Sequence, residues 1–246
     1  MKSESADKEK IEIRLDILRR QDSHEKPYWQ SIFYETEDLN ATVASALTEI
    51  NQNKNIVDIE GKTVGPIRWE CSCLQKKCGA CAMIIDGQPK LACNSFLRNY
   101  KNRKKIIIEP LRKFPVIADL IVDRSILFEN LKRMKLWAEG EVQIQEKNTE
   151  IVYEASRCLQ CGCCLEVCPN FYPGGSFFGA AGFVPTARLL SSLSPEEQRR
   201  MKEAYLKHEY EGCGKSLACA KICPAEISVE KLLVNLNASV FRRKHV

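Results

Sequence analysis

The first fifty residues combine two strand patterns with one helical pattern. Within residues 10–19, apolar residues at every second position alternate with charged ones, which is the period of a strand with one buried face. Residues 28–34 are aromatic and β-branched, and they predict a second strand paired with the first in a hairpin. Asn40 or Thr42 can then cap a helix that runs through Ile50. The apolar stripe of this helix consists of Val43, Ala46, Leu47 and Ile50.

Shorter strand patterns follow this helix. Residues 82–85 are apolar, and the Asp86-Gly87 pair after them is typical of a tight hairpin turn that leads into Leu91-Ala92. Residues 105–109 predict a last strand, because Pro110 directly after them cannot continue it. Two strands, then a helix, then short strands form the element order of a ubiquitin-like β-grasp fold.

Helical spacing replaces the strand patterns in the second half. Ser125 can cap a helix, and similar stripes recur within residues 189–193 and 232–240. The glycine-rich stretches 174–176 and 179–182 are expected to be loops. The apolar residues expected to form the core on these helices are Leu127, Leu131, Met134, Leu189, Leu190, Leu193, Leu232, Leu233, Leu236 and Val240.

The change from strands to helices near residue 108 predicts two domains. We expect an α+β protein, with a β-grasp domain over residues 1–108 and an all-α domain over residues 109–246. A chain of 246 residues is long enough to bury a core in each of them.

Composition narrows the class of protein. With 44% hydrophobic and 28% charged residues, the chain is ordinary for a globular protein, and no apolar run approaches the roughly eighteen residues of a membrane helix. The N-terminus has neither a secretory signal nor an Arg-rich transit peptide, so we expect a reducing compartment. Thirteen cysteines in such a compartment favour metal ligation over disulfides.

The cysteines of the second half follow the spacing of bacterial-type ferredoxins. The run C-x2-C-x2-C-x3-C-P places them at Cys158, Cys161, Cys164 and Cys168. In this motif three thiolates hold one cluster and the fourth reaches a second cluster. A second block contains Cys213 and repeats the ending C-x3-C-P at Cys219 and Cys223. By the crossing rule, one [4Fe–4S] cluster would be held by Cys158, Cys161, Cys164 and Cys223.

The other centre of this domain would have only three thiolates. Its ligands are expected to be Cys168, Cys213 and Cys219. A second C-x2-C-x2-C run would need a cysteine at position 216, which is serine. Three thiolates favour a [3Fe–4S] cluster, whereas a Ser216 alkoxide ligand or a labile fourth iron stays open as an alternative.

The first domain has the plant-type spacing C-x4-C-x2-C with a fourth cysteine farther along. These residues are Cys73, Cys78, Cys81 and Cys93. This spacing predicts a [2Fe–2S] cluster, and Gly79 would let the backbone approach its inorganic sulfur. A zinc knuckle is the alternative, because Cys78 and Cys81 alone would fit zinc. Cys71 and Cys163 fall outside all three sets and are expected to be spare thiols.

No competing active site emerges from the sequence. His24, His208 and His245 stand alone, and each is expected to be a surface residue. There is no dinucleotide fingerprint, no nucleophile motif and no aromatic–basic pattern for nucleic acid. Cofactors for single-electron steps without a site for an organic substrate indicate a chain that serves a catalytic partner.

With the cysteines in this order, the chain resembles the iron–sulfur subunit of succinate dehydrogenase and fumarate reductase (complex II). The resemblance includes residues 78–83, residues 86–93, residues 113–123 and the two Cys-Pro blocks. It implies a flavoprotein partner with FAD and a membrane anchor with quinone. Among the forms of this family, the sequence looks closer to those with a single haem-bearing anchor. The resemblance also implies that the [2Fe–2S] cluster lies toward the flavin and the [3Fe–4S] cluster toward the quinone. Such a subunit is expected to be peripheral on the cytoplasmic face of a prokaryotic inner membrane.

Three positions depart from the pattern of many members of this family. Those members carry tryptophans after the first Cys-Pro and a histidine after the next cysteine, where this chain has Tyr172, Pro173 and Gly214. The departures leave quinone contact by this subunit open and do not affect the cluster ligands. A related interpretation is that the chain is the iron–sulfur subunit of glycolate oxidase or of a thiol-dependent fumarate reductase. A redox-sensing or zinc-stabilised interaction protein is the alternative from another class.

Overall fold

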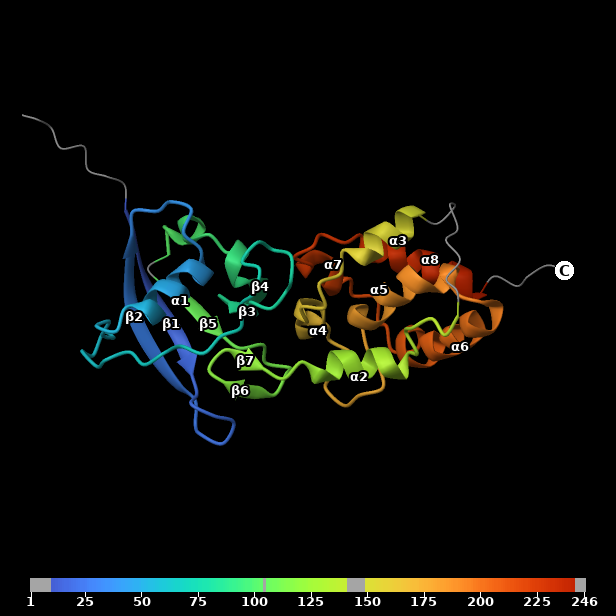
Figure 1. The fold of residues 1–246 in the computed structure, drawn as a ribbon, viewed down its shortest axis with the longest axis horizontal. Helices are drawn as coiled ribbons and strands as arrows, with labels where there is room; N and C mark the ends of the chain where they lie inside the picture. Colours follow the sequence, from blue (N-terminus) through green and yellow to red (C-terminus); the bar gives the residue numbers. More distant parts are fainter. Residues whose placement is uncertain (1–9, 104, 141–148, 242–246) are drawn as a thin grey trace, which may run out of the picture. The chain divides into compact units, whose positions relative to one another are not determined.

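The computed structural model describes residues 10–103, 105–140 and 149–241. The chain forms two compact units, coloured blue to green and green to red in Figure 1. The first comprises the described residues up to Arg112 together with Val116–Val122, and the second comprises Lys113–Pro115 and the described residues from Asp123 onward. None of the described helices is both long enough and apolar enough to cross a membrane.

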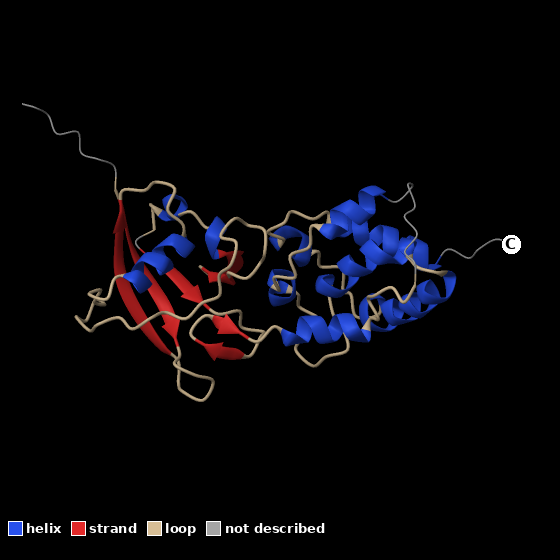
Figure 2. Cartoon of the chain, in the orientation of Figure 1, coloured by secondary structure: helices blue, strands red, loops and turns tan. Residues whose placement is uncertain are grey.

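A mixed five-stranded sheet forms the first unit (Figure 2). Its central pair is parallel, with Leu15 opposite Ile106, and all the other pairs are antiparallel. From one edge to the other the strands are β2 (Tyr28–Thr36), β1 (Ile11–Arg19), β5 (Lys105–Glu109), β3 (Ala82–Ile85) and β4 (Gln88–Leu91). This order, with a parallel pair between the first and last long strands, is that of the predicted β-grasp fold.

Helix α1 (Val43–Gln52) lies across one face of this sheet (Figure 1). Thr42 caps it: its hydroxyl accepts the Ser45 N–H at 3.1 Å, and the Ser45 hydroxyl accepts the Thr42 N–H at 2.7 Å. The four residues of the predicted stripe are all buried. The alternative cap, Asn40, is not used. Two short 3-10 turns, η1 (Ala92–Asn94) and η2 (Leu97–Tyr100), follow β4.

The predicted Asp86-Gly87 turn joins β3 to β4. Both residues have positive φ, 49° and 75°, which is the geometry of a type I′ hairpin. The Asp86 carboxylate also accepts the backbone N–H of Ile107 at 2.8 Å and so ties the turn to the neighbouring strand β5.

A second, two-stranded sheet in the first unit was not predicted. It pairs β6 (Val116–Ala118) with β7 (Ile121–Val122), and the turn between them carries Asp119 with φ of 43°. Asp119 is buried and accepts hydrogen bonds from Arg19 Nε at 3.0 Å and from the Arg68 backbone at 2.9 Å. This buried ion pair fastens the turn to the end of β1. Sequence periodicity could not find it, because its partners are a hundred residues apart.

Replacing Asp119 with alanine is expected to destabilise the protein by about 3–5 kcal/mol, because it leaves the buried Arg19 charge without its partner. The measurement is urea unfolding of anaerobic protein followed by far-UV circular dichroism. The control is Arg199→Ala, which removes an ion pair whose side chains are 65% and 62% exposed and should change stability by less than about 0.5 kcal/mol. Equal effects of the two substitutions would contradict this account of the network.

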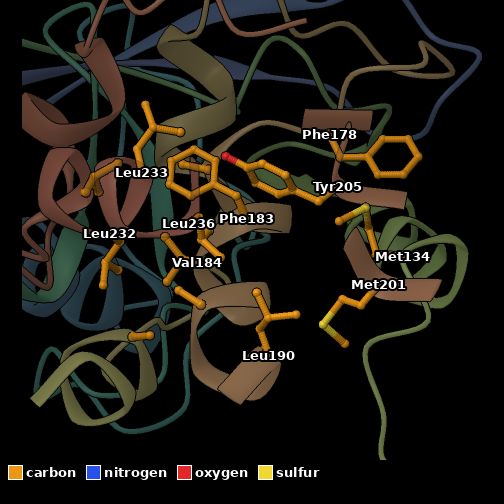
Figure 3. Packing of buried hydrophobic residues seen from close by; sticks show 14 of the residues in the cluster. Met134, Phe178, Phe183, Val184, Leu190, Met201, Tyr205, Leu232, Leu233 and Leu236 are labelled. Carbon is orange, nitrogen blue, oxygen red and sulfur yellow. The ribbon is translucent and has the colours of Figure 1, made fainter. Parts of the chain in front are cut away.

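Helices build the second unit. In chain order they are α2 (Ser125–Arg133), α3 (Thr149–Ser156), α4 (Cys163–Val167), α5 (Ala180–Leu189), the 3-10 turn η4 (Leu190–Ser192), α6 (Pro195–Tyr205), the π-helical turn η5 (Leu206–Tyr210), α7 (Ala218–Ile222) and α8 (Val229–Phe241). Their apolar faces meet in one core, and Figure 3 shows Phe183 and Tyr205 at its centre. The Tyr205 hydroxyl donates to Asn237 at 2.6 Å, which satisfies the polar end of this buried ring.

Several local predictions for the second unit were wrong. Ser125 is the first helical residue of α2 and not its cap; its N–H donates to the Asp123 carboxylate at 2.8 Å. Residues 180–182 begin helix α5 instead of forming a loop, and this helix contains Pro185. Leu193 lies beyond the end of η4, although it is buried as predicted.

His208 is also a correction, since it is buried and was expected at the surface. Its ring stacks on Phe178 with centroids 4.3 Å apart, and its Nδ1 lies 2.7 Å from the Ser176 carbonyl oxygen. The contacts are those of a core histidine. His24 is exposed as predicted, and His245 lies outside the described residues.

Candidate iron–sulfur centres

The loop before β3 surrounds Cys73 with backbone donors. The Cys73 sulfur accepts N–H groups of Gln75 and Lys77, each at 3.3 Å, and the Cys93 sulfur accepts the Lys76 N–H at 3.4 Å. Positive φ at Leu74, Lys76 and Gly79 turns the amides of this loop inward and so makes a concave site for negative charge. Hydrogen bonds from Gln75 and Lys77 lower the pKa of Cys73 to about 7.

The other cysteines of this predicted set lie within interaction range of one another. Cys73 is hydrogen-bonded to Cys78, and Cys81 interacts with Cys78 and Cys93. Burial is the largest cause that raises the pKa of Cys81, to about 12, and its cysteine neighbours add to it. Four sulfurs gathered around inward-pointing amides fit a [2Fe–2S] cluster, whose negative charge such donors stabilise.

The four cysteines of the second predicted set line one hollow in the helical unit. Its walls include Cys158, Cys161, Cys164 and Cys223, with Ala181, Pro224, Ala225 and Ile227 around them. Burial is the largest cause that raises the pKa of Cys158, to about 11, and of Cys164, well above its ordinary value. Buried thiols that also repel each other's ionised forms need a positive partner, which iron would supply.

The two cysteine blocks repeat the same backbone. Gln160 and Gly162 have positive φ in the first block, and Lys215 and Leu217 have positive φ at the same offsets in the second. A five-residue helix follows in each case, α4 or α7, and a Cys-Pro ends it. When the two blocks are aligned on this repeat, Ser216 corresponds to Cys161. The second block therefore has a serine where the first has a cysteine.

The three cysteines of the third predicted set influence one another as well. Burial is the largest cause that raises the pKa of Cys219, to about 11, and Cys168 and Cys213 add to it. Cys168 directly follows α4, whereas Cys219 lies in α7, so two helices bring the set together. Ser216 is exposed and contributes no thiol to it.

Among the described residues, no three cysteine, histidine or acidic side chains are grouped so that they could hold one metal ion.

The two cysteines outside the sets differ in their surroundings. Cys71 is exposed. Cys163 is fully buried, and a hydrogen bond to Cys161, followed by burial, raises its pKa well above the ordinary value. The same hydrogen bond lowers the pKa of Cys161 to about 7. Cys163 thus contacts Cys161, a member of the second predicted cysteine set.

Two side chains near the cysteines had no predicted role. The Lys113 ammonium donates to the Cys168 carbonyl and, at 3.0 Å, to that of Phe171, and so holds the chain after α4. Gln160 donates from Nε2 to the Cys158 sulfur at 3.3 Å. Neither could be found from spacing: Lys113 acts from far along the chain, and Gln160 depends on a left-handed backbone at a non-glycine residue.

Glu209 is a buried carboxyl beside the third cysteine set. It is 1% exposed, and neither oxygen has a hydrogen-bond partner within the part of the chain that the structure describes. Burial, followed by Cys213 and Cys168, raises its pKa well above the ordinary value. A Cβ at Gly182 would lie 2.0 Å from its Oε1, so only glycine leaves room for this side chain.

We expect Glu209→Gln to stabilise the protein at neutral pH. Because the pKa of Glu209 is raised in the folded protein, its protonated carboxyl contributes fully to folding stability below the unfolded-state pKa of about 4.3. This contribution is lost as the pH rises toward the pKa of the folded state. Glutamine removes this loss, so the gain in Tm should grow from pH 5 to pH 8 and reach about 2–4 °C. Scans at one heating rate would measure it, with the exposed Glu211→Gln as control. A gain that does not change with pH would contradict the raised pKa.

Comparison with known proteins agrees with this geometry. A family model described as a 2Fe-2S iron-sulfur cluster binding domain matches residues 14–129, and one described as a 4Fe-4S dicluster domain matches residues 154–227. The succinate dehydrogenase iron-sulfur subunit of Bacillus subtilis is 32% identical over 232 residues, which cover 90% of each chain. The chain belongs to the succinate dehydrogenase and fumarate reductase iron–sulfur subunit family. The predicted family and the predicted fold class are therefore confirmed.

Other relatives of this iron–sulfur subunit extend the comparison. The fumarate reductase iron-sulfur subunit of Wolinella succinogenes is 27% identical and covers 96% of this chain and 97% of its own. An uncharacterised iron-sulfur protein of Methanocaldococcus jannaschii is 34% identical, but this chain spans only 44% of its length. In fold, a chain of the Mycobacterium smegmatis Sdh1 complex matches with a TM-score of 0.78, 21% identity and coverage of 97% and 99%.

The positions that depart from the family pattern lie near the third cysteine set. Tyr172 is 63% exposed, and Gly214 directly follows Cys213. A Cβ at Gly214 would lie 3.3 Å from the Asn170 amide, so a histidine at this position of the iron–sulfur subunit would require Asn170 to move.

Proposed function

We propose that this chain relays electrons one at a time between FAD in a flavoprotein subunit and quinone at a membrane anchor. It is an electron-transfer subunit of the succinate dehydrogenase and fumarate reductase family and carries [2Fe–2S], [4Fe–4S] and [3Fe–4S] clusters. The observation that carries the proposal is the gathering of eleven of the thirteen cysteines into three separate groups. One cluster would allow binding of an electron, whereas three support a relay.

The ligand sets are proposed as predicted from the spacing. Cys73, Cys78, Cys81 and Cys93 would hold [2Fe–2S]; Cys158, Cys161, Cys164 and Cys223 would hold [4Fe–4S]; Cys168, Cys213 and Cys219 would hold [3Fe–4S]. The amides around Cys73 support the first set, the hollow around Cys158 the second, and the influence of Cys168 and Cys213 on Cys219 the third.

The clusters supply single-electron acceptance and donation, with potentials set by cluster type, hydrogen bonding and burial. The chain's own residues then hold each cluster and adjust its surroundings. Backbone amides of Gln75 and Lys77 stabilise negative charge at Cys73. The apolar residues around the second cysteine set exclude water, which strengthens electrostatic interactions there.

The chain's place in the cell follows from its partners. As part of complex II it is associated with the membrane through other subunits. We propose that it lies on the cytoplasmic face of a prokaryotic inner membrane, held by an anchor subunit that binds quinone and carries haem. The flavoprotein subunit would hold the site for succinate or fumarate, because iron–sulfur clusters carry out single-electron steps and the two-electron chemistry of these substrates takes place at FAD.

Low-temperature EPR of the purified complex tests this function. The oxidised complex is expected to show a [3Fe–4S] signal, and reduction is expected to abolish it and to produce a [2Fe–2S] signal. Succinate should reduce at least the [3Fe–4S] cluster when the flavoprotein is present. A complex with both signals that succinate cannot reduce would contradict the proposed relay.

The second candidate is the alternative from the sequence, the iron–sulfur subunit of another dehydrogenase of the glycolate oxidase or thiol-dependent fumarate reductase type. The relative from Methanocaldococcus jannaschii leaves this candidate open, because at 34% identity that uncharacterised protein is more than twice as long as the region matched here. Oxidation of a thiol pair or of glycolate by the purified complex, without turnover of succinate and quinone, would favour it.

A further inference from the structure

Gln160 lies between two ligands of the second cysteine set, Cys158 and Cys161, and its side chain turns back toward the first of them. Its amide Nε2 donates to the Cys158 sulfur at 3.3 Å and to the Ala181 carbonyl oxygen at 3.2 Å. We propose that this hydrogen bond makes Gln160 a positioning residue that raises the reduction potential of the [4Fe–4S] cluster. The proposal rests on the ligand set assigned to that cluster above.

The orientation of the Gln160 amide is fixed by Ala181. A carbonyl oxygen only accepts hydrogen bonds, so the amide must present its NH2 group to it. A flipped amide would set two oxygens against each other and leave both without donors. Ala181 itself is held in the first turn of α5. The second N–H of the same NH2 group is therefore aimed at Cys158 by the structure.

The arrangement is unfavourable for stability alone. Gln160 Oε1 is buried and has no hydrogen-bond partner among the described residues. Its backbone has φ of 49°, a left-handed conformation that non-glycine residues seldom adopt. An apolar side chain of the same length would fill the space without a buried unpaired oxygen. Compared with such an apolar side chain, glutamine adds a hydrogen-bond donor to the Cys158 sulfur.

The direction of the effect follows from charge. Reduction adds one electron to the cluster and its thiolates, so the reduced state is the more negative one. An N–H that donates to a ligand sulfur stabilises the more negative state and therefore raises the potential. The repeated backbone offers an internal comparison, because Lys215 has the same conformation in the second block, with φ of 55°, but is exposed.

Redox titration of the complex, followed by EPR, tests the proposal with Gln160→Met. Methionine has nearly the same length and no donor, and the equilibrium constant for one-electron reduction of [4Fe–4S] should fall about tenfold, which is about 59 mV. The potentials of the [2Fe–2S] and [3Fe–4S] clusters in the same sample should stay unchanged. Gln160→Glu, which replaces the donor with a carboxylate, should lower the [4Fe–4S] potential further. Lys215→Met is the matched control and should leave it unchanged.

The outcomes separate this proposal from the assignment on which it rests. An unshifted [4Fe–4S] potential in Gln160→Met, or an equal shift of all three clusters, would overturn the role of Gln160. A wild-type complex without a [4Fe–4S] signal would instead overturn the ligand assignment. If neither variant assembles, wild-type protein labelled with 15N in the glutamine side chain decides the matter. Pulsed EPR of its reduced [4Fe–4S] cluster should show coupling to that nitrogen, and absence of the coupling would contradict the hydrogen bond.

Discussion

Ser216→Cys is expected to convert the third centre from [3Fe–4S] to [4Fe–4S]. The oxidised complex would lose its [3Fe–4S] EPR signal, and a new [4Fe–4S] signal would appear on reduction. The physical reason is the internal repeat: Ser216 lies where Cys161 lies in the first block, between two residues of positive φ. A thiolate there would complete the fourth corner of a cubane that Cys168, Cys213 and Cys219 leave open.

Ser216→Ala is the matched control for this conversion. If serine is not a ligand, alanine should leave the [3Fe–4S] signal in place, because Ser216 is exposed and its loss creates no cavity. Loss of the signal in the alanine variant would support the alkoxide alternative. An unchanged [3Fe–4S] signal in Ser216→Cys would contradict the alignment of the two blocks.

Cys223→Ser is expected to abolish the [4Fe–4S] signal while the [3Fe–4S] signal remains. Cys223 belongs to the second cysteine block, yet it lines the hollow of Cys158 and Cys164 and acts on the pKa of both. The reciprocal variant, Cys168→Ser, should abolish the [3Fe–4S] signal although Cys168 follows the first block. EPR of the oxidised and reduced complexes measures both effects.

The exposed Cys71 provides the control for this pair of variants. Cys71→Ser makes the same chemical change outside the three sets and should leave all three signals intact. If Cys223→Ser instead abolished the [3Fe–4S] signal and spared [4Fe–4S], each block would hold its own cluster. The crossing of ligands between the blocks would then be wrong.

The elements that could be predicted are those with local signals. The alternation in β1 and the stripe of α1 follow from one buried face each, and Asp86-Gly87 specifies its own turn. Cysteine spacing is likewise local, because a tight loop brings sulfurs three residues apart toward one centre. The sequence was therefore sufficient to predict the family and the cluster types.

The features that could not be predicted depend on contacts between distant segments or on unusual backbone. Asp119 accepts a hydrogen bond from Arg19 and lies in a turn that has no periodic sequence pattern. Glu209 is buried, although a glutamate is ordinarily expected at the surface. Gln160 contacts Cys158 because its φ is positive, which composition does not reveal. Ser125 was wrongly predicted as the cap of α2, because it is itself the first helical residue; its N–H donates to the Asp123 carboxylate.

Iron and acid-labile sulfide analysis of anaerobically purified complex tests the central claim most directly. Three clusters of the proposed types require about nine iron atoms and about ten inorganic sulfides for each copy of this chain, beyond any haem iron of an anchor. We expect these amounts, with zinc below one atom per chain. Zinc without sulfide, or iron sufficient for only one cluster, would contradict the relay of three centres.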